Sequence, residues 1–237
     1  ENVDWEKYLT AEQFYNNFVA DDRFVKYILG GLKTTLIITL FAVLLGIFLG
    51  FLVGTVRSTY ERTGKLVVLN AVCRVYLSVI RGTPVAVQLM IMYFFIFAAP
   101  GSSKLLSAIL AFGINSGAYV SEIVRGGLMS VDKGQMEAGR SLGLGYGTTM
   151  RFVIVPQAVK AILPALGNEF IVLLKDTSLI TVIGGKELLY AAQGIYNRTY
   201  EQMFPLVGTA AIYLVLVIIL SWLLGKLERR LRQSDRR

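Results

Sequence analysis

Two long stretches without a charged residue constrain the fold of this 237-residue chain more than any other feature. One runs from Thr34 to Val56 and the other from Gln202 to Gly225. About 20 helical residues cross the hydrocarbon core of a bilayer, which is roughly 30 Å thick, so each stretch is long enough to span a membrane. A helix on a soluble domain would usually show a charged and polar face, which neither stretch has. Both therefore predict membrane-spanning helices.

Three shorter apolar stretches bring the expected number of crossings to five. Charged residues make up 17% of the chain, against roughly 25% in a typical soluble domain. The expected crossings cover residues 25–56, 84–98, 104–124, 151–174 and 203–224. Residues 66–80 are expected to form an interfacial helix before the second crossing, which begins at Pro84 because proline is tolerated in the first helical turn. The fold class is an all-α membrane protein.

The domain division follows from these crossings. A transmembrane domain should cover residues 25–230. We expect an extracellular amphipathic segment over 1–24, which is acidic and aromatic, and a basic cytoplasmic tail over 231–237. Within the first crossing, Gly46, Gly50 and Gly54 are spaced by four residues, so they share one helix face. Small residues at this spacing predict close packing against another helix.

Lysine and arginine residues predict how the chain is oriented. They gather in three segments, residues 57–81, 126–151 and 226–237, and cytoplasmic loops of membrane proteins carry an excess of these residues. With five crossings, the N-terminus should lie outside and the C-terminus inside. The net charge of +8 is spread over segments beside the membrane spans, which argues against a nucleic-acid-binding face.

Several function classes are excluded by what the sequence lacks. It contains no histidine and one cysteine, Cys73, which removes His-based catalysis, most soft-metal sites and internal disulfides. No G-x-x-x-x-G-K-[ST] phosphate loop is present. We therefore expect no catalytic residues and no metal ligands, and these absences argue against an enzyme.

The polar segment between the third and fourth crossings predicts a docking helix. Residues 134–142 are expected to form a short amphipathic helix that Gly143 ends, with Met136 and Leu142 as its apolar anchors. A short cytoplasmic helix between two spans is a suitable contact for a soluble partner. A surface helix that only connects the spans is the alternative, and the residues alone leave both open.

Four sequence blocks carry a resemblance to a known family. Glu137-Ala138-Gly139, then Gly143 and then Val153 to Pro156, resemble the EAA signature of permease subunits of bacterial ABC importers. The blocks Arg81 to Pro84, Ser121 to Gly127 and Lys175 to Leu179 resemble the branch of that family that imports polar amino acids such as histidine, glutamine, arginine and cystine. Gly139, Val153 and Val155 depart from the commoner Ala, Ile and Leu of the signature without altering its helix-then-turn pattern.

The resemblance implies a mechanism and a set of partners. Two permease subunits, identical or related, would pair in the inner membrane of a bacterium, and an extracellular binding protein would deliver the amino acid. Cytoplasmic ATPase subunits would bind ATP and magnesium, so this chain would hold no cofactor of its own. The implied function is ATP-driven import by alternating access, with the coupling helix contacting the ATPase. The residues assigned to this coupling are Glu137, Ala138, Gly139, Arg140 and Gly143.

A zwitterionic amino acid inside a membrane needs charged partners, because an isolated charge is costly there. An acidic side chain would hold the ammonium group, a basic one would hold the carboxylate, and neutral groups would line the path. The candidate substrate-binding residues are Asn115, Ser116, Tyr119, Glu122, Arg125, Glu169, Lys175 and Asp176. For Glu122 and Arg125, a purely structural i, i+3 ion pair is an equally supported interpretation.

A secondary amino-acid transporter or channel that works without an ATPase is the alternative function. It would account for the spans and the charged residues within them. It would not account for the segment from Glu137 to Pro156, and a single set of five crossings lacks the repeat that such carriers usually contain.

Overall fold

The computed structural model describes residues 10–234 and is built of helices, with no strand among those residues. Four of its helical stretches are long and apolar enough to cross a membrane: Phe24–Thr63, Lys104–Met129, Tyr146–Ile183 and Met203–Leu231. A fifth crossing is reached if the bent pair Val67–Gly82 and Val85–Ile96 counts as one span. An all-helical fold with four to five candidate spans agrees with the expected fold class. Residues 1–9 and 235–237, which hold parts of the two predicted terminal segments, lie outside the described residues.

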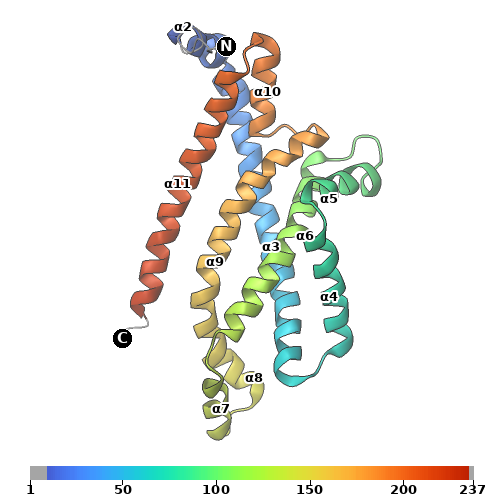
Figure 1. Ribbon diagram of the computed structural model, residues 1–237, viewed down its shortest axis with the longest axis vertical. Helices are drawn as coiled ribbons and strands as arrows, with labels where there is room; N and C mark the ends of the chain where they lie inside the picture. The colour runs from blue at the N-terminus through green and yellow to red at the C-terminus, as the bar shows by residue number, and fades with distance from the viewer. Residues whose placement is uncertain (1–9, 235–237) are drawn as a thin grey trace, which may run out of the picture.

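The helices run alternately up and down the long axis of the molecule (Figure 1). Helix α3 (Gly30–Thr63) continues the turns before it, and α4 (Val67–Gly82), α5 (Val85–Ile91) and α6 (Lys104–Met129) follow. The short helices α7 (Lys133–Ser141) and α8 (Tyr146–Thr149) lie at one end of the molecule, and α9 (Val155–Asp176) leads back. Helix α10 (Leu188–Thr199) lies at the other end with α2 (Ala11–Phe14), and α11 (Met203–Ser234) completes the chain.

The second apolar region folds differently from its prediction. We expected an interfacial helix up to Ile80 and a spanning helix from Pro84. Instead α4 runs beside α3 and α6, and the segment Val85–Ile96 turns away from it by 105° (Figure 1). The chain breaks at Thr83, whose backbone is extended, because Pro84 disfavours helical geometry in the residue before it. One face of α4 is exposed and apolar, as expected for contact with lipid, and it presents Val68, Val72, Val75 and Val79.

Helices α3 and α6 form the most extensive helix pair of the fold, and glycine makes this packing possible. A Cβ atom added at Gly50 would lie 2.4 Å from Cγ1 of Val120 and 2.9 Å from the backbone nitrogen of Ser121. A Cβ atom added at Gly46 would be similarly close to the Ser116 side chain, and one added at Gly54 would be similarly close to the backbone oxygen of Ser121. The prediction that the glycine face packs closely against another helix is confirmed, and its partner is α6.

Replacing Gly50 by alanine should destabilise the protein. The added methyl group has no room beside Val120 and a backbone atom, and overpacking of this kind costs about 1–3 kcal/mol. We expect a lower apparent melting temperature of the detergent-solubilised protein, measured by size-exclusion chromatography after heating. Gly225→Ala in α11 is the matched control, because nothing lies within 4 Å of its added Cβ. Equal melting temperatures for the two variants would contradict this account of the packing.

Candidate functional site

A polar cavity of about 490 Å³ opens where α6, α9 and the bend between α4 and α5 meet. This polar cavity has a volume within the range of small-ligand sites. Its walls combine charged and neutral polar groups with apolar ones. The lining residues are Arg81, Gly82, Thr83, Pro84, Val85, Asn115, Tyr119, Glu169, Val172, Leu173 and Asp176.

The bend that forms one wall of the polar cavity is fixed by Gln88. Its Nε2 donates hydrogen bonds to the Ile80 carbonyl oxygen at 2.7 Å and to the Thr83 Oγ1 at 2.8 Å. Its Oε1 accepts a hydrogen bond from Nδ2 of Asn115 on α6 at 3.0 Å. Gln88 therefore joins both sides of the bend to α6, so the Thr83 and Pro84 backbone is held at the cavity wall.

The charges of the polar cavity come from three different elements. Arg81 lies at the end of α4, with its guanidinium carbon 5.6 Å from the centre of the Tyr119 ring, which is within the range of a cation–π contact. Glu169 and Asp176 come from α9, and both are half-buried. The Glu169 Oε1 accepts a hydrogen bond from Ser116 at 2.8 Å. Neither carboxylate forms an ion pair within residues 10–234, so both are available to a cationic group.

The structure brings four of the eight predicted substrate-binding residues to this cavity, and they are Asn115, Tyr119, Glu169 and Asp176. Ser116 contacts the cavity only through Glu169. Lys175 is exposed and outside the cavity lining, because it points to another side of α9 than Asp176. Arg81 was missed as a candidate, although an arginine that interrupts an apolar stretch just before Gly-Thr-Pro was a visible signal.

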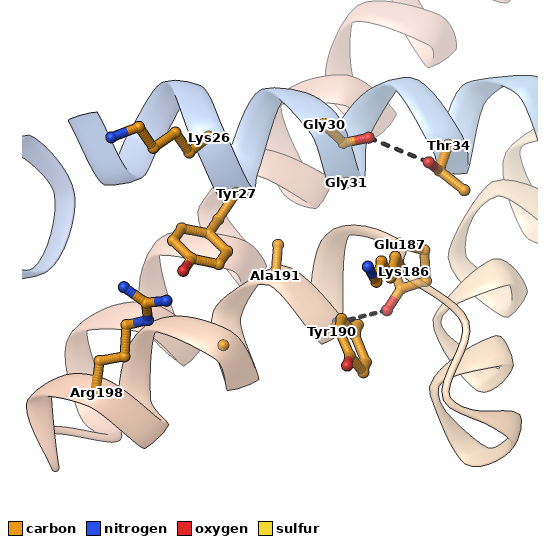
Figure 2. Close-up of a pocket in the computed structure, with 11 residues that line it drawn as sticks. Lys26, Tyr27, Gly30, Gly31, Thr34, Lys186, Glu187, Tyr190, Ala191 and Arg198 are labelled. Atoms are coloured by element: carbon orange, nitrogen blue, oxygen red, sulfur yellow. Dashed lines mark hydrogen bonds between the residues drawn. The ribbon is translucent and has the colours of Figure 1, made fainter. Parts of the chain in front are cut away.

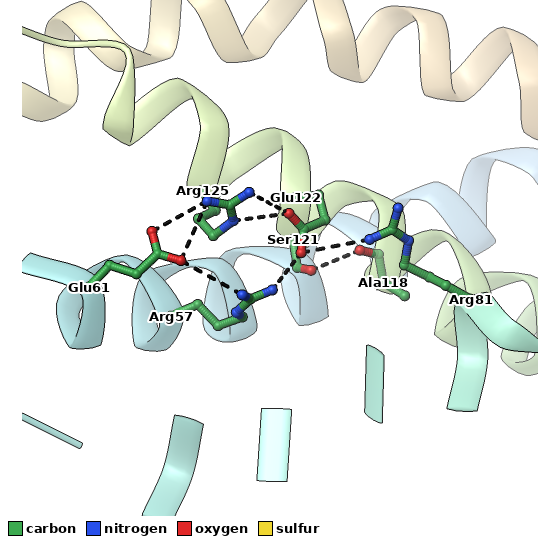
Figure 3. A network of polar contacts seen from close by, with 7 residues as sticks. All are labelled: Arg57, Glu61, Arg81, Ala118, Ser121, Glu122 and Arg125. Carbon is green, nitrogen blue, oxygen red and sulfur yellow. Dashed lines mark hydrogen bonds and ion pairs between the residues drawn. The ribbon is translucent and has the colours of Figure 1, made fainter. Parts of the chain in front are cut away.

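Glu122 and Arg125 belong to an ion-pair network outside the polar cavity (Figure 3). The Glu122 Oε2 accepts a hydrogen bond from Nε of Arg125 at 2.9 Å and lies 2.8 Å from its Nη2, and the Glu122 Oε1 lies 2.6 Å from Nη1 of Arg57. Glu61 on α3 lies 3.3 Å from Arg125 and 3.7 Å from Arg57. The i, i+3 pair is present, and it forms part of a link between α3 and α6.

A second cavity of about 380 Å³ adjoins this network, and we call it the arginine cavity. Its floor includes Gly82 and Leu77, and Ser78 adds a hydroxyl group. Its charged residues are Arg57, Arg74, Arg81 and Glu122. Arg81 and Gly82 line the polar cavity as well, so the two cavities are neighbours.

The predicted coupling segment forms a short, well-defined helix, α7. Asp132 caps its first turn by accepting a hydrogen bond from the Gly134 amide at 2.6 Å. Gly143 follows the helix with a φ of +83°, a left-handed conformation that glycine adopts readily. Buried Gly139 packs against Thr149, where an added Cβ would lie 2.5 Å from a methyl carbon.

The face of α7 that points away from the rest of the chain carries most of the predicted coupling residues. Glu137, Ala138 and Arg140 are exposed. Of the two expected apolar anchors, Met136 packs against a buried cluster of α6 and α9 side chains, whereas Leu142 is 81% exposed. An exposed leucine beside two charged residues leaves an apolar contact available for a partner.

A third cavity, the outer cavity, lies at the opposite end of the molecule, beside α10 (Figure 2). It has a volume of about 540 Å³, and its basic lining residues are Lys26, Lys186 and Arg198. Glu187, which also lines it, is fully buried and accepts hydrogen bonds from Thr181 and from the Tyr190 amide at 2.6 and 2.7 Å. Burial raises the pKa of the Glu187 carboxyl, and these hydrogen bonds act in the opposite direction.

Comparison with known proteins identifies close relatives of this chain. The glutamine transport system permease protein GlnP of Escherichia coli (strain K12) is 41% identical over 168 residues, which cover 70% of this chain and 77% of that protein. The arginine transport system permease protein ArtQ of Bacillus subtilis (strain 168) is 43% identical over 162 residues, which cover 68% of this chain and 74% of that protein.

Solved structures and a family match agree with these relatives. A crystal structure of an amino acid ABC transporter with histidines matches with a TM-score of 0.82 and 39% identity, over 90% of this chain and 98% of that one. The MetNI methionine ABC transporter, in an inward-facing conformation, shares the fold with a TM-score of 0.74 at 20% identity, over 88% of this chain and 97% of that one. The family described as binding-protein-dependent transport system inner membrane component matches residues 42–233. The chain therefore belongs to the inner membrane components of binding-protein-dependent transport systems.

Proposed function

We propose that this chain is the membrane subunit of an ATP-driven importer and that it carries a polar amino acid through the polar cavity. The observation that carries the substrate assignment is the placement of Arg81 in the same cavity as Glu169 and Asp176. An arginine guanidinium binds a carboxylate with paired hydrogen bonds, and a carboxylate binds an ammonium group. The cavity therefore offers complementary partners to both charged groups of an amino acid.

The balance of charge in the polar cavity favours a substrate with a cationic or hydrogen-bond-donating side chain. An amino acid zwitterion requires one cation and one anion from the protein, and the cavity supplies one guanidinium and two carboxylates. The second carboxylate is left for the side chain of the substrate. An unpaired carboxylate in a membrane is costly, so a substrate that neutralises it gains binding free energy.

The coupling residues support a separate ATPase partner. Helix α7 presents Glu137, Ala138 and Arg140 together with exposed Leu142, a mixed surface that suits docking into a groove of a soluble subunit. In this proposal α7 is cytoplasmic, the C-terminus is inside and the N-terminus is outside the inner membrane of a bacterium. ATP and magnesium are held by the ATPase, and this chain binds neither of them and carries out no reaction.

Two further partners complete the proposed assembly. A second permease subunit, identical or related, would pair with this one, and α11 and α4 leave large apolar faces for lipid or for that subunit. An extracellular amino-acid-binding protein would dock at the end of the molecule that holds α10. There the outer cavity exposes Lys186 and Arg198, which would attract acidic side chains of that protein.

Reconstitution separates this function from a secondary transporter. The chain would be co-expressed with its ATPase and placed in liposomes with the binding protein. Uptake of radiolabelled amino acids would then be measured with ATP, without ATP and with an ion gradient alone. We expect uptake only with ATP. Uptake driven by an ion gradient, without any ATPase, would reject the importer and establish the secondary transporter.

Glu169→Gln should weaken binding of a cationic amino acid to the purified complex by at least tenfold. The variant loses a charge-assisted hydrogen bond, which is worth about 1.5–3 kcal/mol. Equilibrium binding of radiolabelled arginine, lysine and histidine would be compared with that of glutamine, and the loss should be larger for the cationic substrates. Glu12→Gln, an exposed acid far from the cavity, is the control. Unchanged affinities in the Glu169 variant would place the substrate elsewhere.

Glu137→Lys should abolish ATP-dependent uptake while amino acid binding is retained. The substitution reverses an exposed charge on α7, which touches no part of the polar cavity. Pull-down of the ATPase and ATP hydrolysis in proteoliposomes would be measured alongside uptake. Glu228→Lys, the same charge change near the C-terminal end of α11, should behave like the unaltered protein. Normal uptake by the Glu137 variant would show that coupling does not depend on this face of α7.

A further inference from the structure

The arginine cavity contains more positive than negative charge, even after its ion pairs are counted. Arg57 and Arg125 share both carboxylates of the network, Glu61 and Glu122, at distances from 2.6 to 3.7 Å. Arg81 lies 3.8 Å from the Glu122 oxygen that Arg57 already contacts at 2.6 Å. The carboxylates are therefore used mainly by the first two arginines.

Arg74 adds a further cation to the arginine cavity. Its side chain is exposed and makes no ion pair or hydrogen bond with the part of the chain that the structure describes. Counting the adjoining network, four arginines thus meet two carboxylates, and three of these arginines and one carboxylate line the cavity of about 380 Å³. Because uncompensated charge is costly within a membrane protein, the arrangement favours an anion from outside the chain.

The position of the arginine cavity indicates where that anion comes from. Arg81 and Gly82, at the end of α4, line both this cavity and the polar cavity, so the two cavities adjoin there. The polar cavity has two carboxylates and one arginine, whereas the arginine cavity has three arginines and one carboxylate. A zwitterion that moved from the first to the second would keep Arg81 within reach of its carboxylate and would meet two new arginines.

We infer that the arginine cavity is a second anion site, which receives the carboxylate of the amino acid as it leaves the polar cavity. This inference rests on the proposed function. Arg74 and Arg81 bind the carboxylate, and Ser78 contributes a hydroxyl group. Gly82 leaves the backbone uncovered where the two cavities meet, because no side chain projects there. The site holds the substrate briefly on its way to the end of the molecule where α7 lies.

A thiol placed in the arginine cavity tests for the anion site directly. Ser78→Cys would be made in a Cys73→Ala background, which has no other cysteine, and the complex would be placed in nanodiscs of phosphatidylcholine. Its reaction rates with an anionic reagent, sulfonatoethyl methanethiosulfonate, and with the cationic trimethylammonioethyl analogue would be compared. We expect a bias towards the anionic reagent, and we expect Arg74→Gln to reduce that bias about threefold, as the loss of one nearby charge predicts.

The matched control is Lys65→Gln, which removes one cation from the loop between α3 and α4 without touching the cavity. It should leave the ratio of rates unchanged. Equal labelling rates with the anionic and the cationic reagent would overturn the anion site. An equal loss of the bias in Lys65→Gln and Arg74→Gln would overturn it as well.

The identity of the anion is tested by protection. A saturating amino acid should slow labelling at least threefold in phosphatidylcholine nanodiscs. Protection by phosphatidylglycerol in the nanodiscs, without protection by the amino acid, would assign the site to a lipid phosphate and overturn the inference. If the complex binds no amino acid while the charge bias persists, the proposed function itself has failed, and the inference fails with it.

An uptake measurement provides a second test that needs no cysteine. Arg74→Gln should lower the maximal rate of ATP-dependent uptake at least threefold while equilibrium binding of the amino acid stays unchanged, because Arg74 does not line the polar cavity. Lys65→Gln should affect neither quantity. An unchanged uptake rate in the Arg74 variant would contradict a site on the transport path.

Discussion

The close contact between the backbones of α3 and α6 is the constraint on which the rest of the structure depends. In a membrane there is little hydrophobic driving force between helices, so their association relies on van der Waals packing and on polar contacts. Gly46, Gly50 and Gly54 provide that packing because they place no side chain of α3 against Ser116, Val120 and the backbone of Ser121. Helix α6 is thereby fixed, and both candidate sites take side chains from it. Asn115 and Tyr119 reach the polar cavity, and Glu122 reaches the arginine cavity.

The distribution of charge follows from the same cost of burying ions in a membrane. The polar cavity holds two acidic residues and one arginine, whereas the arginine cavity holds three arginines and one acidic residue. Arg81 lines both cavities. The network of Glu61, Glu122, Arg57 and Arg125 satisfies most of the remaining charge while it links α3 to α6. The polar cavity takes none of its lining residues from that network, whereas the arginine cavity shares Arg57 and Glu122 with it.

The sequence predicted where the helices lie along the chain better than it predicted the directions in which helices and side chains point. Hydropathy identified the spans, and the glycine spacing identified a packed face, because both depend on short-range periodicity. The sequence predicted the break between α4 and the segment after it but not the bend of 105° between them, since a proline indicates a break without giving its angle. Lys175 and Arg125 were proposed as substrate contacts from their charge and their position on or just after a span, and neither lines the polar cavity. Which way each side chain points depends on helix rotation, and only the packed structure fixes that. Arg81 was missed for the same reason.

The helical stretch from Tyr146 to Ile183 connects the end of the molecule that holds α7 with the wall of the polar cavity. Between Met150 and Asp176 it extends about 39 Å, at 1.5 Å per residue. Treated as a lever, a tilt of about 5° at the first end moves the far end by about 3 Å, which equals the length of a hydrogen bond. Pro164 lies along this lever and removes a backbone hydrogen bond there. Any displacement that travels along this helix from α7 must therefore pass Pro164 before it reaches Glu169 and Asp176.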